Sequence, residues 1–168
     1  MENRQYAAIV SRMAEHDKGS PKRIQHFLKV HAFARTIGTA EGLDDEELYV
    51  LETAALVHDI GIRDALVKYG SEAGPYQEKE GPALAKQLLE ETGGYTAEQI
   101  ERVMYLVGHH HTYTDIRGMD YRILVEADFL VNLFESSVKY RGILAAEKTI
   151  FQTETGKRLL ALQFENQE

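Results

Sequence analysis

Apolar residues recur at intervals of three and four along most of the chain, the spacing that places them on one face of a helix. In the first segment these residues are Tyr6, Ile9, Val10 and Met13. The polar stretch HDKGSPK at 16–22 interrupts the pattern, and its Ser20 and Pro21 are typical of an N-cap followed by proline in a first turn. We therefore predict a short helix over 3–15 and a second from Pro21 to about Gly42.

The next apolar run opens at Asp44 or Asp45 and predicts a third helix that ends near Gly61, because glycine commonly ends helices. From Ile62 to Glu80 the helical spacing fades and glycine, proline and polar residues dominate. We predict a long loop there, with at most a short helix. A helix then resumes from Pro82 to about Glu91.

Further helical segments follow. Thr96 and Gln99 form the capping-box pattern before an apolar stripe that reaches the sequence GHHHTY at 108–113. Another stripe spans about 120–136, and residues 142–165 supply one or two more helices, with Gly156 as the break. No segment alternates apolar and polar residues as a strand would. The sequence therefore predicts a single all-α domain over 1–168, with about six to eight helices and its core motifs within 21–136.

Composition agrees with a folded globular domain and narrows its partners. The 168 residues are 43% apolar and 27% charged, which is ordinary for a soluble domain. The 19 Lys and Arg against 27 Asp and Glu give a formal charge of −8. A surface of that sign repels the phosphate backbone, so we expect no binding to a nucleic-acid duplex. A small anionic substrate held at a metal ion is compatible with the charge.

The chain has no cysteine, which excludes disulfides, thiolate metal sites and cysteine nucleophiles. The N-terminal segment lacks the apolar run of a signal peptide. The most apolar segment, 123–134, is interrupted by Glu126, Asp128 and Asn132, so it does not read as a membrane span. We therefore expect a cytoplasmic protein with no membrane partner.

Several polar residues stand where the helical spacing predicts buried positions: His26, His58, His110 and Asp128. Burying an unpaired polar group costs about 1–3 kcal/mol, and buried charges are normally paired or bound to metal. Each histidine alone could be an ordinary core residue, but several such positions in one chain favour a shared cause. Imidazole and carboxylate together suit a divalent transition metal such as Fe, Mn, Zn, Ni or Co.

The order of these residues resembles the HD-domain superfamily, whose defining pattern is a His, a His-Asp pair and a distal Asp on an all-α scaffold. Three blocks carry the resemblance: RIQHFLKVHAFA, AALVHDIG and ILVEADFLVNL. It implies one metal ion with four ligands: His26, His58, Asp59 and Asp128. His31 competes with His26 for the first position. We prefer His26 because the first His of the family stands four residues before a valine, as His26 does before Val30.

Some members of the superfamily hold a second ion with additional histidines. That resemblance makes His109, His110 and Glu80 candidate ligands of a second ion, with Glu80 near a position where the family often has a histidine. The alternative for the histidine run is a solvated helix end, where cationic histidine complements the negative end of the helix dipole.

The resemblance implies a metal-dependent phosphohydrolase that acts on a small, nucleotide-like phosphomonoester or phosphodiester through a metal-activated water. Asp59 would orient that water, and Asp64 or Glu80 would serve as a base. The residues expected to bind the substrate are Arg23, Arg63, Lys79 and His111. Ile62 stands where related nucleotidases carry a glutamate, so the resemblance does not assign their specific reaction.

Two other functions stay open at this point. One is a di-iron oxygenase of the same superfamily, and the other is a non-catalytic metal-binding module. The apolar face of the first helix could pack on its own domain or on a second copy of the chain, which leaves a homodimer open as well.

Overall fold

Three helices form the centre of the fold: α2 (Pro21–Ala40), α3 (Asp45–Val57) and α7 (Met119–Glu135). Each of them packs against the other two. Every residue of α3 from Val50 to Val57 is buried, as expected for a helix that is covered by neighbours on all sides. This computed structural model describes residues 1 and 3–165; residues 2 and 166–168 of the predicted domain lie outside the described residues.

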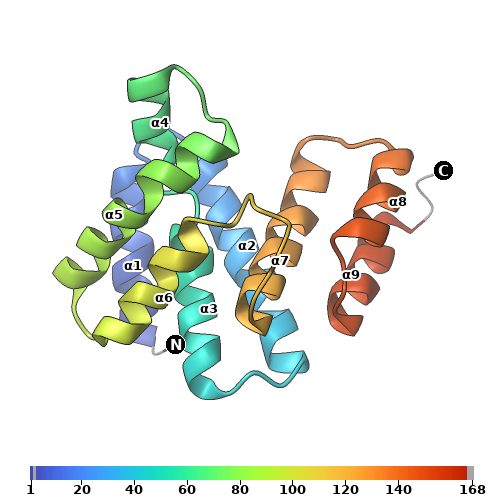
Figure 1. Ribbon diagram of the computed structural model, residues 1–168, viewed down its shortest axis with the longest axis horizontal. Coiled ribbons are helices and arrows are strands. Elements are labelled where there is room, and N and C mark those ends of the chain that lie inside the picture. Colours follow the sequence, from blue (N-terminus) through green and yellow to red (C-terminus); the bar gives the residue numbers. More distant parts are fainter. Residues whose placement is uncertain (2, 166–168) are drawn as a thin grey trace.

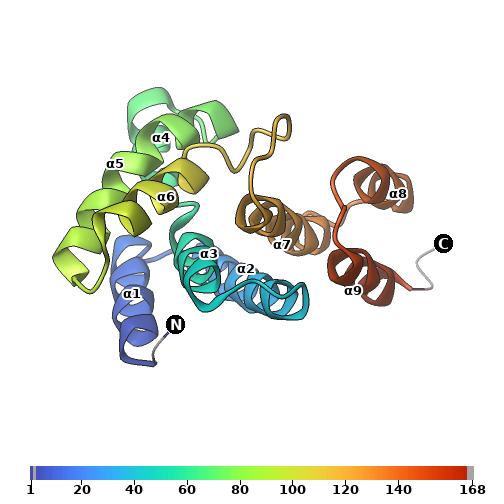
Figure 2. The same ribbon diagram turned by 60° about the horizontal axis from the view of Figure 1, so that its bottom comes forward.

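The remaining helices lie on two sides of this centre (Figures 1 and 2). One side holds α1 (Asn3–His16), α4 (Ile62–Tyr69), α5 (Gly74–Thr92) and α6 (Ala97–Val107). On the other side, α8 (Tyr140–Thr149) and α9 (Glu154–Phe164) lie beyond α7. The described residues thus form nine helices and no strand, which confirms the all-α fold class. None of these helices is both long and apolar enough to cross a membrane.

Two of the helix starts follow from local side-chain chemistry that is legible in the sequence. The Asp44 side chain accepts hydrogen bonds from the backbone N–H groups of Glu46 and Glu47 at the start of α3. Thr96 and Gln99 form the predicted capping box at the start of α6. Such caps satisfy N–H groups that have no partner within the helix.

The predicted long loop over 62–80 is wrong, because most of that segment is helical. Residues 62–69 form α4, whose apolar residues at 62, 65, 66 and 69 have helical spacing over only two turns. The start of α5 is marked by Pro75 in its first turn. Pro82 lies inside α5 rather than at its start. A proline there removes one N–H donor, and α5 continues through that local loss.

Two glycines have roles other than the predicted helix breaks. Helix α3 ends at Val57, and Gly61 has an ordinary φ of −73° at the start of α4. A Cβ on Gly61 would lie 2.6 Å from the backbone oxygen of Gln77, so glycine is needed for the close packing of α5. Gly156 lies in the first turn of α9, and the break falls at 150–153. There, buried Glu126 accepts hydrogen bonds from the backbone N–H groups at 152 and 153.

Candidate metal centre

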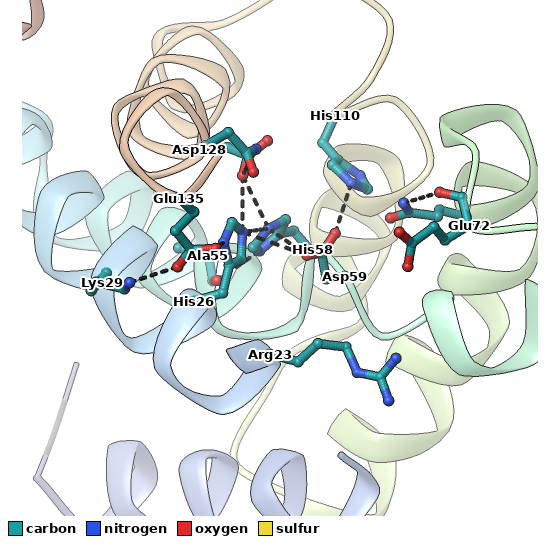
Figure 3. Close-up of polar contacts among 12 residues, drawn as sticks. Arg23, His26, Lys29, Ala55, His58, Asp59, Glu72, His110, Asp128 and Glu135 are labelled. Carbon is teal, nitrogen blue, oxygen red and sulfur yellow. Dashed lines mark hydrogen bonds and ion pairs between the residues drawn. The ribbon is translucent and has the colours of Figure 1, made fainter. Parts of the chain in front are cut away.

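Four polar side chains converge where α2, α7 and the end of α3 meet (Figure 3). His26 comes from α2, His58 and Asp59 directly follow α3, and Asp128 comes from α7. His26 Nε2 lies 3.3 Å from His58 Nε2 and 3.1 Å from Asp128 Oδ1. His58 Nε2 lies 3.6 Å from Asp128 Oδ1, and both Nε2 atoms lie 3.5 Å from Asp59 Oδ2. The structure therefore brings together the four residues that the sequence grouped. We call them the primary cluster.

The orientation of both histidines leaves their Nε2 atoms facing the cluster. His58 Nδ1 lies 2.9 Å from the carbonyl oxygen of Ala55, which can only accept a hydrogen bond. His58 therefore carries its Nδ1 proton there, and Nε2 of the neutral ring is available for a metal. His26 Nδ1 likewise lies 3.2 Å from an acceptor, Glu135 Oε2, so its Nε2 faces the cluster. A carboxylate or carbonyl behind each imidazole is a common arrangement for metal-binding histidines.

Opposite charges dominate the electrostatics of the primary cluster. Burial alone would lower the pKa of His58, but Asp59 and Asp128 outweigh it and raise that pKa to about 9. Burial would raise the pKa of both aspartates, yet the adjacent histidines hold each well below its usual range. Two ionised carboxylates are thus buried against two imidazoles. A divalent cation can take the place of the imidazole protons, because metal binding displaces protons from its ligands.

A second group of metal-capable side chains shares Asp59 and adds His110 and His111, which follow α6. Asp59 Oδ1 lies 3.4 Å from His110 Nε2, while Oδ2 faces the primary cluster. His110 Nδ1 donates to the carbonyl oxygen of Val107 at 2.8 Å. Among the described residues, the buried Nε2 atoms of His110 and His111 have no hydrogen-bond partner. Burial, with the neighbouring His110, lowers the pKa of His111 to about 4, so its ring is neutral at pH 7.

A cavity of about 320 Å³ opens onto His26 and Asp59. This volume suits a small molecule. Its other polar lining residues include Lys22, Arg23, Glu72, Gln77, His111 and Glu135. Arg23 Nε lies 3.1 Å from Asp17 Oδ1, an ion pair that holds the guanidinium beside the cavity. The Lys22 side chain has no partner among the described residues, so its charge is available to a ligand.

The structure does not bring the two predicted bases, Asp64 and Glu80, to this cavity. Asp64 Oδ2 lies 3.2 Å from Lys68 Nζ, one turn further along α4. Glu80 forms an ion pair with the same lysine and accepts a hydrogen bond from Tyr69 Oη at 2.6 Å. Both carboxylates therefore belong to the contact between α4 and α5.

Three other predicted site residues also lie elsewhere. Arg63 donates to the carbonyl oxygen of His16 at 3.1 Å, on the side of α1. Lys79 Nζ lies 5.2 Å from the ring centroid of Tyr69. His109 stacks on Tyr105 with 4.2 Å between ring centroids, and its Nδ1 faces the carbonyl oxygen of the same residue. In the second group His111 takes the place that the sequence analysis gave to His109.

Sequence reasoning missed two residues that fix the primary cluster from behind. Asn132 Nδ2 donates to Asp128 Oδ1 at 2.8 Å. Glu135 accepts from Lys29 Nζ at 2.6 Å, and burial would raise its pKa, but Lys29 and His26 hold that pKa below its ordinary value. Both residues follow Asp128 by four and seven positions on α7, the spacing of one helix face. That spacing was a usable signal.

His26 and His31, the two candidates for the first histidine of the motif, lie on different faces of α2. His31 is buried, and its ring centroid lies 4.9 Å from that of Tyr6 on α1. His31 belongs to neither group of metal-capable residues. It therefore has the place of a core histidine, and His26 is the residue that faces the other ligands.

Buried His31 predicts its own loss of stability in mild acid, opposite in sign to the contribution of His58, whose raised pKa favours the folded state as the pH falls. Burial lowers the pKa of His31 from 6.5, although Glu52 opposes the shift and Arg35 and the α-amino group of Met1 add to it. The unfolded state then binds more protons, so stability falls as the pH drops through about 6.5. We expect His31→Leu to remove this contribution, so that between about pH 7.5 and 5.5 the variant gains stability relative to the wild type in urea unfolding with chelator present. Parallel pH profiles for the two proteins would contradict the prediction.

Comparison with known proteins gives a family match and a structural match. A family model described as HD domain matches residues 23–150. Among solved structures, the chain is similar to a protein described as a predicted HD superfamily hydrolase from an uncultured Thermotogales bacterium, with 25% sequence identity and a TM-score of 0.66. The alignment covers 93% of this chain and 83% of that one. No curated protein matches the chain.

Proposed function

The chain belongs to the HD-domain family, a family of metal-dependent hydrolases, and from that membership we propose that it hydrolyses a small phosphate ester. The observation that carries the proposal is the convergence of His26, His58, Asp59 and Asp128 below a cavity that also holds cationic side chains. Two nitrogen and two oxygen ligands suit a divalent transition metal. The cavity gives a small anionic substrate access to it.

The residues of the primary cluster would hold one ion. Bound there, such an ion would supply an activated water and would polarise a phosphoryl oxygen of the substrate. Asn132 and Glu135 keep Asp128 and His26 in place, so the ligand positions are set before anything binds. Asp59 Oδ1 faces His110, and with a single ion bound in the primary cluster it would be free to accept a hydrogen bond from the attacking water.

Residues of α2 would bind the anionic substrate. Arg23 lines the cavity, and Asp17 engages its Nε, which leaves the terminal nitrogens to donate to a phosphate. Lys22 adds a second positive charge at the same wall. These cations offset the carboxylates around the site and stabilise negative charge as it develops on the phosphoryl oxygens.

A second ion would be held by Asp59, His110 and His111, because the two oxygens of Asp59 face the two groups separately. Two observations on the described residues support this placement: His110 Nε2 faces Asp59 Oδ1 at 3.4 Å, and the buried His111 Nε2 has no hydrogen-bond partner. Elemental analysis of anaerobically purified protein distinguishes one ion per chain from two.

The proposed reaction is tested with p-nitrophenyl phosphate and bis(p-nitrophenyl) phosphate as monoester and diester probes. We expect Mn²⁺-loaded protein to hydrolyse at least one probe, chelator to abolish the activity, and added Mn²⁺ to restore it. Fully loaded protein that hydrolyses neither probe would overturn the proposal. Oxygen consumption by iron-loaded protein with an organic substrate would then favour the oxygenase alternative.

A further inference from the structure

Gln77, in the first turns of α5, has a buried side-chain oxygen without a partner. The residue lines the cavity and is 6% exposed. Its Nε2 donates to the carbonyl oxygen of Glu72 at 2.7 Å. A carbonyl only accepts, so this bond fixes the amide with Oε1 as its remaining polar atom. Among the described residues, Oε1 has no hydrogen-bond partner.

The buried Oε1 of Gln77 requires a hydrogen-bond donor. Leaving a buried polar group unsatisfied is unfavourable, and such groups in folded proteins are nearly always paired with protein, water or ligand. The cavity that Gln77 lines is where such a donor can lie.

A second acceptor lies beside it. The carboxylate of Glu72 lines the same cavity and has no hydrogen bond or ion pair among the described residues. Figure 3 shows Glu72 on the same side of Asp59 as His110, with its carboxylate turned toward the cluster. The backbone of Glu72 is tied to Gln77 by the bond described above. Glu72, in the segment between α4 and α5, and Gln77, in α5, therefore place two acceptors at a cavity whose α2 wall carries Lys22 and Arg23.

We propose that Gln77 and Glu72 bind hydroxyl groups on the organic part of the substrate, and that the enzyme prefers phosphate esters of polyols. The inference rests on the proposed phosphohydrolase function and adds the class of alcohol. The cations of α2 bind the phosphate, because a fully ionised phosphate has hydrogen-bond acceptors and no donors. The pair of acceptors takes the donors that distinguish a polyol from a plain alcohol.

Glycerol 3-phosphate and propyl phosphate form a matched pair of probes, since they have the same carbon chain and differ by two hydroxyl groups. We expect the metal-loaded protein to favour glycerol 3-phosphate in kcat/KM by at least about tenfold, because a site built to bind a hydroxyl discriminates strongly against an analogue that lacks it. A ratio near one would overturn the inference and leave the phosphohydrolase proposal intact.

Substitution of Gln77 tests whether this residue causes the preference for glycerol 3-phosphate over propyl phosphate. Methionine has a similar length and no oxygen acceptor, so Gln77→Met should lower the ratio at least about fivefold, with most of the loss on glycerol 3-phosphate. Glu72→Gln, at an exposed position, should lower the ratio to a smaller extent. The matched control is Gln87→Met on the same helix, where the exposed glutamine contacts Glu91 and lies outside this cavity. The control should keep the wild-type ratio.

Two further readouts separate the outcomes. Metal content is measured for Gln77→Met, and a loss of metal would overturn the inference, because Gln77 would then be a metal ligand. If neither of these esters and neither p-nitrophenyl probe is hydrolysed, the phosphohydrolase proposal fails. Calorimetric Kd values of the metal-loaded protein for the same two esters still decide this inference, which requires tighter binding of glycerol 3-phosphate and its loss in Gln77→Met. Equal Kd values would overturn it.

Discussion

Replacing Asp128 with alanine is expected to abolish stable metal binding and to reduce hydrolysis to the level of the chelator-treated protein. Asp128 Oδ1 lies within 3.1 Å and 3.6 Å of the Nε2 atoms of His26 and His58, so it is central to the ligand set. Substitution of residues that only orient a ligand already costs about 10- to 100-fold in metal affinity. Loss of a ligand carboxylate should therefore cost more than about 100-fold. Elemental analysis and the p-nitrophenyl phosphate assay measure the two effects.

Helix α7 offers a matched control for that variant. Asp120 is also buried, and it pairs with Arg102 at 2.8 Å and 2.7 Å, away from the metal-capable groups. Asp120→Asn weakens a buried ion pair and should lower stability, but it should keep the metal content of the wild type. An Asp128→Ala protein that retains full metal and full activity would remove the primary cluster from the mechanism.

Three of the four residues of the primary cluster could be predicted from the sequence because each of them breaks an apolar pattern. His26, His58 and Asp128 stand on buried helical faces, and a polar residue there needs a partner. Helical periodicity alone places these positions in the interior of the bundle. Their order along the chain, read with the family resemblance, then selects His26 over His31. Periodicity cannot make that choice, because both histidines are buried on α2.

Arg23 lines the cavity as predicted, but four other predicted residues lie elsewhere for a geometric reason: Asp64, Glu80, Arg63 and Lys79. Arg63 and Asp64 are close to the His-Asp pair in sequence, but they lie on α4, which begins directly after Gly61 and directs them to other contacts. Asp64 and Glu80 consequently meet Lys68 in the contact between α4 and α5. Residues that are close in sequence can be placed close in space only when the path of the backbone between them is known. An eight-residue helix leaves too short a pattern to reveal that path.

Two cavity residues that the sequence did not reveal lie where the loop prediction was wrong. Glu72 and Gln77 reach the cavity because α5 begins at Gly74, two turns before Pro82. His111 approaches the same region closely, since a Cβ on Gly74 would lie 2.8 Å from the His111 side chain. Proline at either position is compatible with a helix start, and only the tertiary packing of α5 selects Pro75.

Gly61→Ala is expected to destabilise the protein by about 2–3 kcal/mol, within the range for overpacking a closed interior. The added methyl group would lie 2.6 Å from the backbone oxygen of Gln77 and 2.8 Å from the backbone nitrogen of Gly81. Backbone atoms cannot rotate away as a side chain can, so the start of α5 has to move as a unit. That movement displaces Gln77 from the cavity, and we expect lower hydrolysis as well as lower stability.

Gly38→Ala on α2 separates the packing of Gly61 from the general effect of adding a methyl group. Its Cβ would meet the ends of the Leu48 and Leu51 side chains, each at 2.9 Å, and that of Leu43 at 3.6 Å. Leucine ends can change rotamer, and alanine gains about 0.5–1 kcal/mol over glycine within a helix. We therefore expect a change of less than about 1 kcal/mol in urea unfolding, with metal content unchanged. Equal stabilities for the two variants would mean that α5 does not depend on the glycine beside the His-Asp pair. Gly61 follows the His-Asp pair by two residues and packs directly against the backbone of Gln77. If this packing does not matter for stability, other contacts must hold Gln77 at the cavity wall.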